Sequence, residues 1–439
     1  METDPVTLKD LNIFAQEERS SIFDKINCTL TSNGESRLIE FLSQPHSNIE
    51  KITETQEILK HFITVLPTWP MQISNGTVMV VEKFYDTHFD SFPAKPSAFQ
   101  SLLYSIFSKH DFTLLNYSLS HCIDFISGIK NIISKLQHDE NPAALRNIIA
   151  EINNILDKEE LSILDTTHQQ KLSKSALLKT GYFLRFRFKH QMQQLLQHHA
   201  TLDAWYSMAK ATDTHHLVFP EMISSEIPVM EADQLYHLLL DKPVPYDVRL
   251  GNQEHFMFLT GANMAGKSTF IKAVGSAVFL AHTGMGVPAQ KMRISALDGL
   301  LSNINITDNL AKGESFFYNE VQRIKSTITK INDGRKWLVL IDELFKGTNV
   351  DDAMKCSKIV IDGLSKISSS IIILSTHLYE LNESLKSIPG IQFNYFATHV
   401  IDDEFSFSYQ LQPGVSNDRL GYLILKKEGV VRMLENIAS

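Results

Sequence analysis

Residues 261–268 have the types and spacing needed to hold phosphate. They read Gly-Ala-Asn-Met-Ala-Gly-Lys-Ser and fit the pattern G-x-x-x-x-G-K-[ST]. Gly261 and Gly266 allow a tight turn that points backbone N–H groups inward, while Lys267 offers charge to the β- and γ-phosphates and Ser268 a hydroxyl to Mg²⁺. An apolar strand precedes the turn and a helix is expected from Ser268 onward, with its positive end toward the phosphates. The segment therefore predicts a site for a nucleoside triphosphate and Mg²⁺; a purely structural glycine-rich turn is the alternative.

Two acids and a histidine follow later apolar strands. Residues 338–341 are aliphatic and lead into Asp342 and Glu343, and the aliphatic residues 371–374 are followed three positions later by His377. An aspartate delivered beside the phosphates suits Mg²⁺ coordination, and Glu343 is placed to hold and deprotonate the attacking water. Ligands bind beyond the carboxyl ends of parallel strands, so His377 is a candidate sensor of the γ-phosphate. Acids that merely face solvent and a structural histidine are the alternatives.

The elements around these residues indicate an α/β domain. From residue 231 short apolar strands alternate with helical stretches and glycine turns, which is typical of a mostly parallel sheet. Upstream, apolar residues recur mainly at helical spacing, and helices with little glycine suggest an elongated arm. We expect a compact helical region over 1–96, a helical arm over 97–230 and the α/β domain over 231–439.

Two local stretches depart from the helical pattern. Residues 76–81, Gly-Thr-Val-Met-Val-Val, are β-prone and predict a short strand. Residues 184–190 alternate basic and aromatic side chains, and on a strand Arg185, Arg187 and Lys189 would share one face. That face is either a small contact to a DNA backbone or, as the favoured interpretation, a solvated surface over buried Phe186 and Phe188.

Composition bounds the class of protein. The 439 residues carry a formal charge of −9, with 43% hydrophobic and 21% charged residues, which is ordinary for a soluble globular chain and gives no bulk basic signature for nucleic acid. The three cysteines are far apart, so neither a disulfide framework nor a zinc site is expected. No secretory signal and no apolar run near the ~20 residues of a membrane span is seen. We expect a cytoplasmic protein without a membrane partner.

The motifs together resemble the ATPase domain of the MutS family of DNA mismatch-repair proteins. Residues 260–269, Thr-Gly-Ala-Asn-Met-Ala-Gly-Lys-Ser-Thr, resemble the family's T-G-P-N-M-G-G-K-S-T, in which the Asn-Met pair sets the family apart. Residues 310–321 resemble L-A-x-G-x-S-x-F-x-x-E-[MV], residues 342–348 resemble D-E-L-G-R-G-T, and residues 375–381 resemble A-T-H-x-x-E-L. Residues 409–421 resemble Y-x-[LV]-x-P-G followed by a spaced glycine, and residues 29–38 the start of the family's helical core domain.

The resemblance implies an ABC-like P-loop ATPase domain preceded by an all-α core and lever. It adds Asn263, Met264 and Thr269 to the ATP-binding loop, and it implies that Ser315 enters the site of a partner copy in a homodimer formed through the ATPase domains. ATP and Mg²⁺ are the implied cofactors and mismatched or branched DNA the implied partner, with hydrolysis switching DNA-bound states in mismatch repair or recombination control. An ATP-gated dimeric scaffold that binds a protein partner is the alternative.

Departures from the family pattern qualify these expectations. Ala262, Ala265, Phe345, Lys346 and Ser375 replace other residues of the quoted motifs. Near the expected adenine contact at 244–248, a tyrosine at 246 stands where the family has asparagine. No Phe-x-Glu wedge of a mismatch-binding domain is found before the core, so we expect a shortened MutS-like protein in which mismatch recognition is in doubt.

Overall fold

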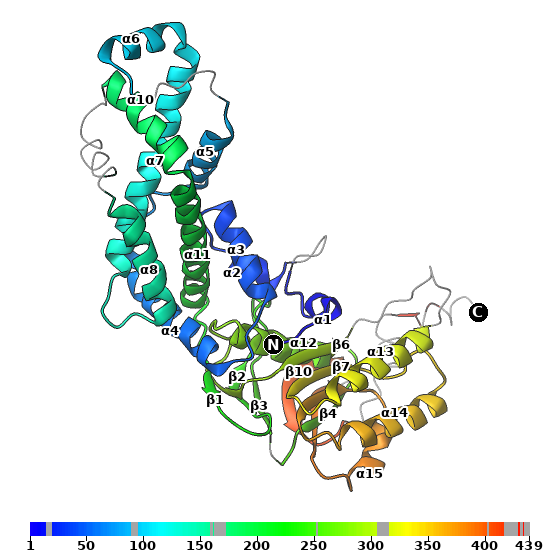
Figure 1. Cartoon of the computed structure of the whole chain (residues 1–439). Coiled ribbons are helices and arrows are strands. Elements are labelled where there is room, and N and C mark those ends of the chain that lie inside the picture. The colour runs from blue at the N-terminus through cyan, green and yellow to red at the C-terminus, as the bar shows by residue number, and fades with distance from the viewer. Residues whose placement is uncertain are drawn as a thin grey trace. The chain divides into compact units, whose positions relative to one another are not determined.

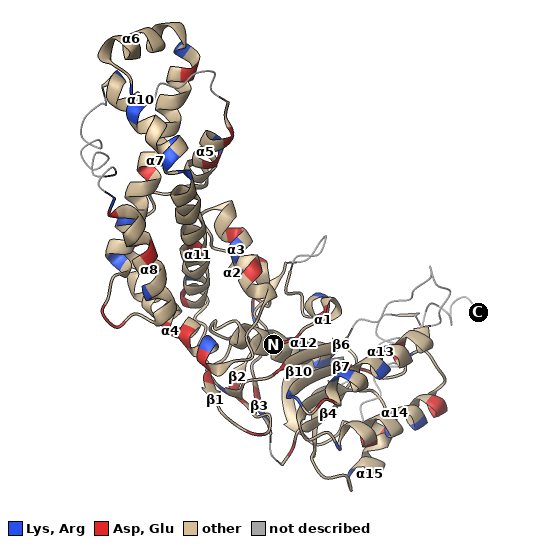
Figure 2. Cartoon of the chain, viewed as in Figure 1, with Lys and Arg blue, Asp and Glu red and all other residues tan. Residues whose placement is uncertain are grey.

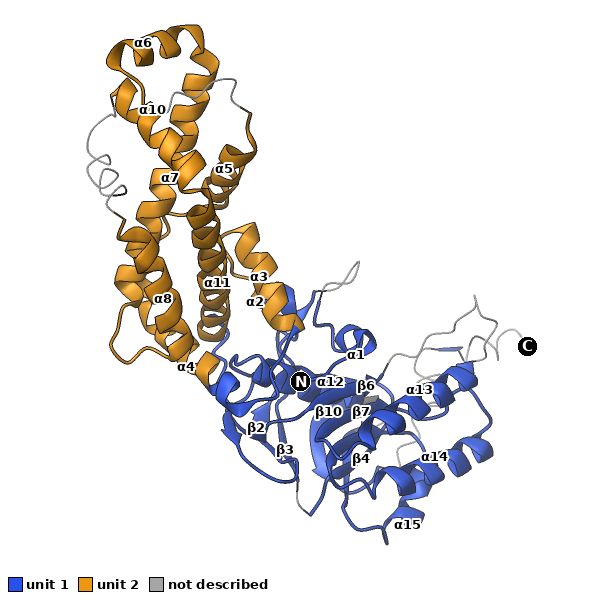
Figure 3. Cartoon of the chain, viewed as in Figure 1, with its two compact units in different colours: residues 1–25, 44–53, 214–439 blue, residues 26–43, 54–213 orange. Residues whose placement is uncertain are grey.

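The computed structural model describes residues 1–14, 20–88, 95–158, 161, 173–251, 253–304, 316–401, 404–416, 429–430 and 433. Contacts divide the chain into two compact units (Figure 3). One, the α/β unit, comprises residues 1–25, 44–53 and 214–439; the other, the helical unit, comprises 26–43 and 54–213. The division into core, lever and ATPase domains implied by the family stays a prediction.

A six-stranded sheet forms the centre of the α/β unit. Its order is β10-β9-β4-β8-β7-β6, and every neighbouring pair is parallel except β9 with β10. In the central strands Leu259 and Asp342 both lie opposite Ser375, so β4, β7 and β8 end at one level. The expected mostly parallel sheet is confirmed. The strand bounds are β4 Phe256–Gly261, β6 Gly299–Asn303, β7 Trp337–Asp342, β8 Ser370–Ser375, β9 Ile391–Ile401 and β10 Glu404–Pro413.

Helices cover both faces of this sheet, because its inner strands carry apolar side chains on each side. Phe258, Val339 and Ile372 point into a buried cluster with residues of α13 (Phe316–Ile331) and α14 (Val350–Leu364). On the opposite face, α12 (Lys267–His282) packs against β4, β7 and β8 (Figure 1). The short elements η6 (Tyr379–Leu381) and α15 (Asn382–Leu385) follow β8.

A second, four-stranded sheet has the order β1-β5-β2-β3. Its strands β2 and β3 form an antiparallel pair whose register shifts between Ala232 and Leu235. The bounds are β1 Glu221–Ile223, β2 Met230–Leu235, β3 Tyr246–Leu250 and β5 Lys291–Ser295.

The first residues of the chain are fastened to the edge strand β6. Asp10, the last residue of α1 (Pro5–Asp10), is 1% exposed, and its carboxylate accepts hydrogen bonds from the Ser302 hydroxyl at 2.6 Å and the Ile304 amide at 2.9 Å. The Thr7 hydroxyl accepts the Ser302 amide at 2.9 Å, and Glu2 forms a parallel bridge to Gly299. A buried carboxylate destabilises the fold unless it is hydrogen-bonded. The bonds from Ser302 and Ile304 offset this cost and so fix the position of Asp10 against β6. The second helix, α2, spans Ile22–Ile26.

The described part of the helical unit contains helices and no strand. Its long helix α11 is tied to the turn before α3 through buried Asp203, whose carboxylate accepts the Leu30 and Thr31 amides at 2.9 Å and the Thr31 hydroxyl at 2.6 Å. Among the helices of the described residues, none combines the length and apolarity needed to cross a bilayer. The helices that lie wholly or partly in this unit are α3 Ser32–Ser43, α4 Ile49–Val65, η1 Leu66–Thr68, α5 Asn75–Asp86, α6 Ala98–Phe107, α7 Lys109–Leu136, α8 Ala143–Leu156, α10 Lys174–Tyr182 and α11 Lys189–Thr214.

The strand predicted at 76–81 is wrong, because these residues lie in helix α5. The Ser74 hydroxyl accepts the Thr77 amide and caps the helix start. Val78, Val81 and Phe84 then lie on one helical face and are buried, and α5 packs against α7. The burial of this face outweighs the strand preference of the valines.

The strand predicted over 184–190 is also wrong. Residues Phe183–Arg187 form a π-helical turn between α10 and α11, so the alternation of basic and aromatic residues produces no two-sided ribbon. The Arg185 guanidinium donates to the carbonyl oxygens of Phe84 and Thr87. Phe188 is buried as expected, whereas Phe186 is exposed. The basic side chains therefore do not form the stripe that the sequence suggested.

Candidate functional site

The predicted phosphate loop connects the buried strand β4 to the start of α12. Gly261 has φ 144° and Gly266 has φ 108°, a backbone region that other residues rarely adopt. A Cβ on Gly261 would also lie 3.3 Å from the Phe396 backbone oxygen. The loop residues Asn263 and Met264 are exposed, with Met264 itself at φ 70°. The strand, turn and helix predicted from the sequence are confirmed.

The lysine of the loop is folded back into the turn. Lys267 is 7% exposed, and its ammonium donates to the carbonyl oxygens of Gly261 at 2.8 Å and Ala262 at 2.9 Å. Burial lowers the pKa of Lys267 to about 8, against the opposing attraction of Asp342 and Glu343. Hydrogen bonds within the loop therefore hold this ammonium beside Gly261 and Ala262.

The carboxylate of Asp342 lies next to the first turn of α12. One carboxylate oxygen accepts a hydrogen bond from the Ser268 hydroxyl and the other from the Ser375 hydroxyl. The parallel register of β7 and β8 places Ser375 beside Asp342. Carboxylate and hydroxyl oxygens are the protein ligands that Mg²⁺ takes together with phosphates, so this pair fits the predicted metal site. Thr269, the next residue of α12, is half-buried.

The residue after Asp342 has an unusual backbone. Glu343 has φ 68°, in the left-handed region, and its amide donates to the Ser375 carbonyl at 2.9 Å, which continues the strand pairing by one residue. Its carboxylate forms an ion pair with Lys346 at 3.2 Å. Left-handed non-glycine residues cost free energy and concentrate at functional sites. The geometry turns Glu343 out of the strand at the edge where Asp342 and Ser268 meet.

His377 reaches the same edge from β8. Its Nε2 lies 3.4 Å from the Lys267 ammonium. Burial, followed by the positive charge of Lys267, lowers the pKa of His377. A neutral imidazole accepts this hydrogen bond from the lysine and keeps its other nitrogen available as a donor.

Glu320 on α13 is a site-supporting residue to which the sequence assigned no role. Its side chain is 2% exposed, and its two carboxylate oxygens accept the amides of Lys346 at 3.0 Å and Gly347 at 3.2 Å. Burial raises the pKa of Glu320. The carboxylate thus holds the turn that follows Glu343. The only sequence signal for it was its place in the segment 310–321.

The departure at position 345 has a structural consequence. Phe345 has φ 58°, so it occupies with a bulky side chain a left-handed position where the family pattern has glycine. Its ring is buried and lies 5.7 Å from that of Phe317 on α13. This packing offsets part of the conformational cost.

Two further predicted positions have different outcomes. Tyr246 is 4% exposed and packs edge-on against Phe270 at 5.2 Å and Phe396 at 5.8 Å, and burial raises its pKa to about 12. It is therefore a core residue rather than an accessible surface for a base. Ser315, predicted to act in a partner copy, lies outside the described residues.

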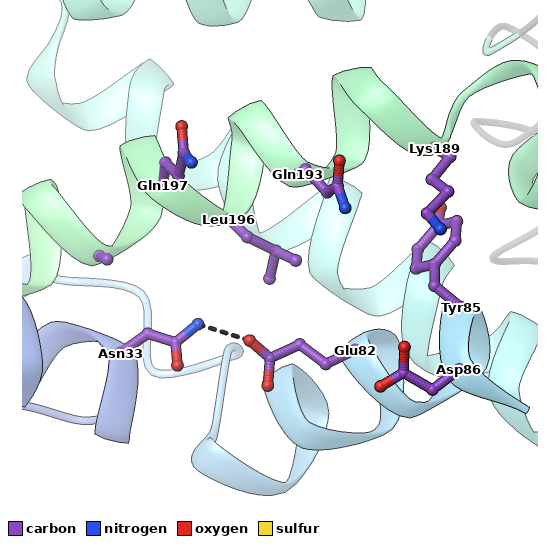
Figure 4. A pocket seen from close by; sticks show the side chains of 9 residues that line it. Asn33, Glu82, Tyr85, Asp86, Lys189, Gln193, Leu196 and Gln197 are labelled. Carbon is purple, nitrogen blue, oxygen red and sulfur yellow. Dashed lines mark hydrogen bonds between the residues drawn. The ribbon is translucent and has the colours of Figure 1, made fainter.

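A hollow of about 600 Å³ lies in the helical unit among α3, α5 and α11 (Figure 4). Asn33 donates to Glu82 at 2.9 Å across one side, and Lys189 lies beside Tyr85 at one end. Most of its lining side chains are exposed and polar. None of the residues predicted to act on a nucleotide lies in it.

A glycine-bounded turn from a central parallel strand into a helix, with an inward lysine and an aspartate on a neighbouring strand, is the arrangement shared by P-loop domains. The sequence comparisons agree with this class. The family model described as MutS domain V matches residues 257–436. This segment, which contains the phosphate loop, Asp342 and His377, is therefore similar to MutS domain V.

Curated relatives extend the match. The chain is 26% identical over 283 residues to the DNA mismatch repair protein MutS of Streptococcus gordonii, which covers 62% of this chain and 33% of the relative. It is 26% identical over 287 residues to the protein of the same name from Streptococcus sanguinis, covering 63% and 33%. The DNA mismatch repair protein HexA of Streptococcus pneumoniae serotype 4 matches at 26% over 284 residues, covering 62% and 33%. The chain spans about a third of the length of these relatives.

Proposed function

We propose that this chain binds ATP with Mg²⁺ and hydrolyses it. One observation carries the proposal: Lys267, Ser268 and Asp342 come together at the carboxyl ends of parallel strands, at the start of a helix. Lysine charge, a hydroxyl and a carboxylate are the groups that a metal-bound triphosphate requires.

Each residue has a role in this proposal. Lys267 exchanges its bonds to the loop carbonyls for bonds to phosphate oxygens, and Ser268 and Asp342 hold Mg²⁺, which supplies charge neutralisation on the phosphates. Glu343 orients the attacking water and accepts its proton, while His377 donates to an oxygen of the terminal phosphate. The loop residues Gly261, Asn263, Met264, Gly266 and Thr269 enclose the phosphates.

The dimeric part of the proposal rests on the family resemblance. A second copy would place its Ser315 at the terminal phosphate, so that hydrolysis depends on pairing of the α/β units. ATP binding would then act as a switch between dimer states.

For a partner, we propose mismatched or branched duplex DNA, after the names of the curated relatives. The alternative, an ATP-gated scaffold for a protein, is favoured by one observation: Arg185, the centre of the suggested basic stripe, uses its guanidinium to bind two backbone carbonyls. The net charge of −9 points the same way.

The test is the ATPase rate as a function of protein concentration, with and without homoduplex, mismatched and four-way-junction DNA. A rate per chain that rises with concentration supports the dimer, and stimulation by one DNA form identifies the substrate. DNA binding that weakens with salt would reflect phosphate contacts. A rate that rises with concentration but ignores every DNA supports the scaffold, and absence of turnover with bound ATP removes the hydrolytic role.

A further inference from the structure

Helix α6, at one end of the helical unit, presents its apolar side chains outward. Five large apolar side chains on it are exposed: Phe99 69%, Leu102 45%, Leu103 36%, Ile106 59% and Phe107 82%. The same helix buries Ser101 and Tyr104 against its neighbours α7 and α10. The usual arrangement of an amphipathic surface helix is thus reversed.

The five positions follow the spacing i, i+3, i+4, i+7, i+8, which is the stripe that a helix uses to pack against another element. With about 200 Å² for a side chain of this size, their exposed parts amount to roughly 500–600 Å². A patch of this area lies at the upper end of what monomers expose and marks an interaction surface.

We infer that this stripe is a contact between two copies of the chain, formed by α6 of one copy antiparallel to α6 of the other. The order of side chains supports a self-complementary contact. Phenylalanines stand at both ends of the stripe and the aliphatic Leu102, Leu103 and Ile106 lie between them. In an antiparallel pair Phe99 faces Phe107 of the second copy and Leu103 lies near the two-fold axis, as a symmetric dimer requires.

The absence of charged residues on α6 also supports a second copy of the chain as the partner of this stripe. Helix α6 carries no charged residue, as Figure 2 shows, so the pair brings no like charges together within the stripe. The nearest charge in sequence, Lys109, belongs to α7 and would lie at the rim. Covering both patches buries about 1,000 Å² in total, at the lower end for a specific complex, so the contact alone is weak. A second contact elsewhere would strengthen it through effective concentration.

The experiment places a cysteine at Leu103 in the full-length chain and measures disulfide formation between copies under mild oxidation. The parent for this test has Cys28 and Cys356, the two native thiols with partial exposure, replaced by serine. We expect Leu103→Cys to give a covalent dimer and the matched control Ile39→Cys, also exposed but on α3, to give none. The cross-link reports on α6 itself and is measured without added nucleotide, so its failure is distinguishable from a failure of nucleotide binding or of pairing through the α/β units.

Sedimentation equilibrium provides the second readout. Leu103→Asp should raise the dissociation constant of the α6 contact at least tenfold, since the symmetric pair would bury two unpaired carboxylates, whereas Ile39→Asp should leave it unchanged. Raising salt should not weaken the contact, unlike binding to DNA or anionic lipid. Absence of the Leu103→Cys cross-link overturns the proposal, and so does an equal yield of cross-link from the Ile39→Cys control. Flotation of a monomeric wild-type chain with phosphatidylserine vesicles, lost in Leu103→Asp, would instead make the stripe a lipid-binding surface.

Discussion

The buried ammonium of Lys267 predicts a steep pH dependence of nucleotide binding. Its pKa is lowered to about 8 because burial in the loop disfavours the charged form. A bound triphosphate favours that charged form, so the site takes up a proton when nucleotide binds above this pKa. Nucleotide affinity should therefore fall as pH rises through 8.

The expected change in nucleotide affinity can be calculated from the lowered pKa of Lys267 and compared with that for an ordinary lysine. With a pKa of about 8, Lys267 is about three-quarters protonated at pH 7.5 and about 3% protonated at pH 9.5, so the dissociation constant should rise about 25-fold. With the ordinary lysine pKa of 10.5, the rise would be only about 10%. The terminal phosphate titrates near pH 6 and contributes little in this window.

Isothermal titration calorimetry with a non-hydrolysable ATP analogue and 1 mM Mg²⁺, at pH 7.5, 8.5 and 9.5, measures this dependence (about 1 mM keeps the metal soluble). Repeating it in buffers of different ionisation enthalpy gives the proton uptake, which should approach about one per site at pH 9.5. A matched control is Lys366→Met, which removes an exposed lysine paired with Asp362 and should leave both readouts unchanged.

An affinity that stays constant from pH 7.5 to 9.5, with no proton uptake, would refute the reasoning. A second check uses the empty protein. Because the folded pKa lies below the unfolded one, the unfolded chain binds more protons between pH 8 and 10.5, and wild-type stability should rise there relative to Lys267→Met. The 2.5-unit difference sets an upper limit of about 3 kcal/mol on that rise.

Three substitutions test the other groups. Glu343→Gln should lower turnover at least about 100-fold while analogue binding stays within about threefold, since only proton acceptance is lost; equal turnover would remove its role. Asp342→Asn should abolish the Mg²⁺ dependence of analogue affinity, measured by titration with and without EDTA, and a retained dependence would place the metal elsewhere. Glu320→Ala should destabilise the chain by about 1–3 kcal/mol in urea unfolding, because the Lys346 and Gly347 amides lose their acceptors; an unchanged midpoint would show that solvent replaces the carboxylate.

The sequence predicted those parts of the site whose positions depend on neighbouring residues in the chain or on the ends of parallel strands. The strand, turn and helix around Lys267 are contiguous, and parallel strands end at one edge, so Asp342 and His377 arrive beside the loop without knowledge of the whole fold. The role of Glu320 depends on a contact between helix α13 and the turn at 346–347, which no local pattern announces. The motif places position 246 near an adenine contact, whereas the burial of Tyr246 depends on Phe270 of α12 and Phe396 of β9, which are distant in sequence.

The errors in the helical unit have a common cause. Valines at 78 and 81 favour strands by themselves, yet they lie in a helix because α7 covers one of its faces. Residues 184–188 connect two helices and lie mostly in a π-helical turn, which holds more residues per turn than an α-helix. In this turn the basic and aromatic side chains do not alternate between two faces, as they would on a strand. Both outcomes depend on neighbours far away in sequence.

The attachment of the first residues to β6 has a consequence for synthesis on the ribosome. Asp10 and the Ser302 hydroxyl are separated by 292 residues, and the complete helical unit is encoded between them. At a translation rate of about 5–20 residues per second, roughly 15–60 s pass between the synthesis of Asp10 and that of Ser302. During that interval the helical unit can fold on its own, while the amino-terminal segment has no β6 to bind. The α/β unit is therefore completed last. A chain whose synthesis stops before β6 would leave the amino-terminal segment exposed to chaperones and proteases.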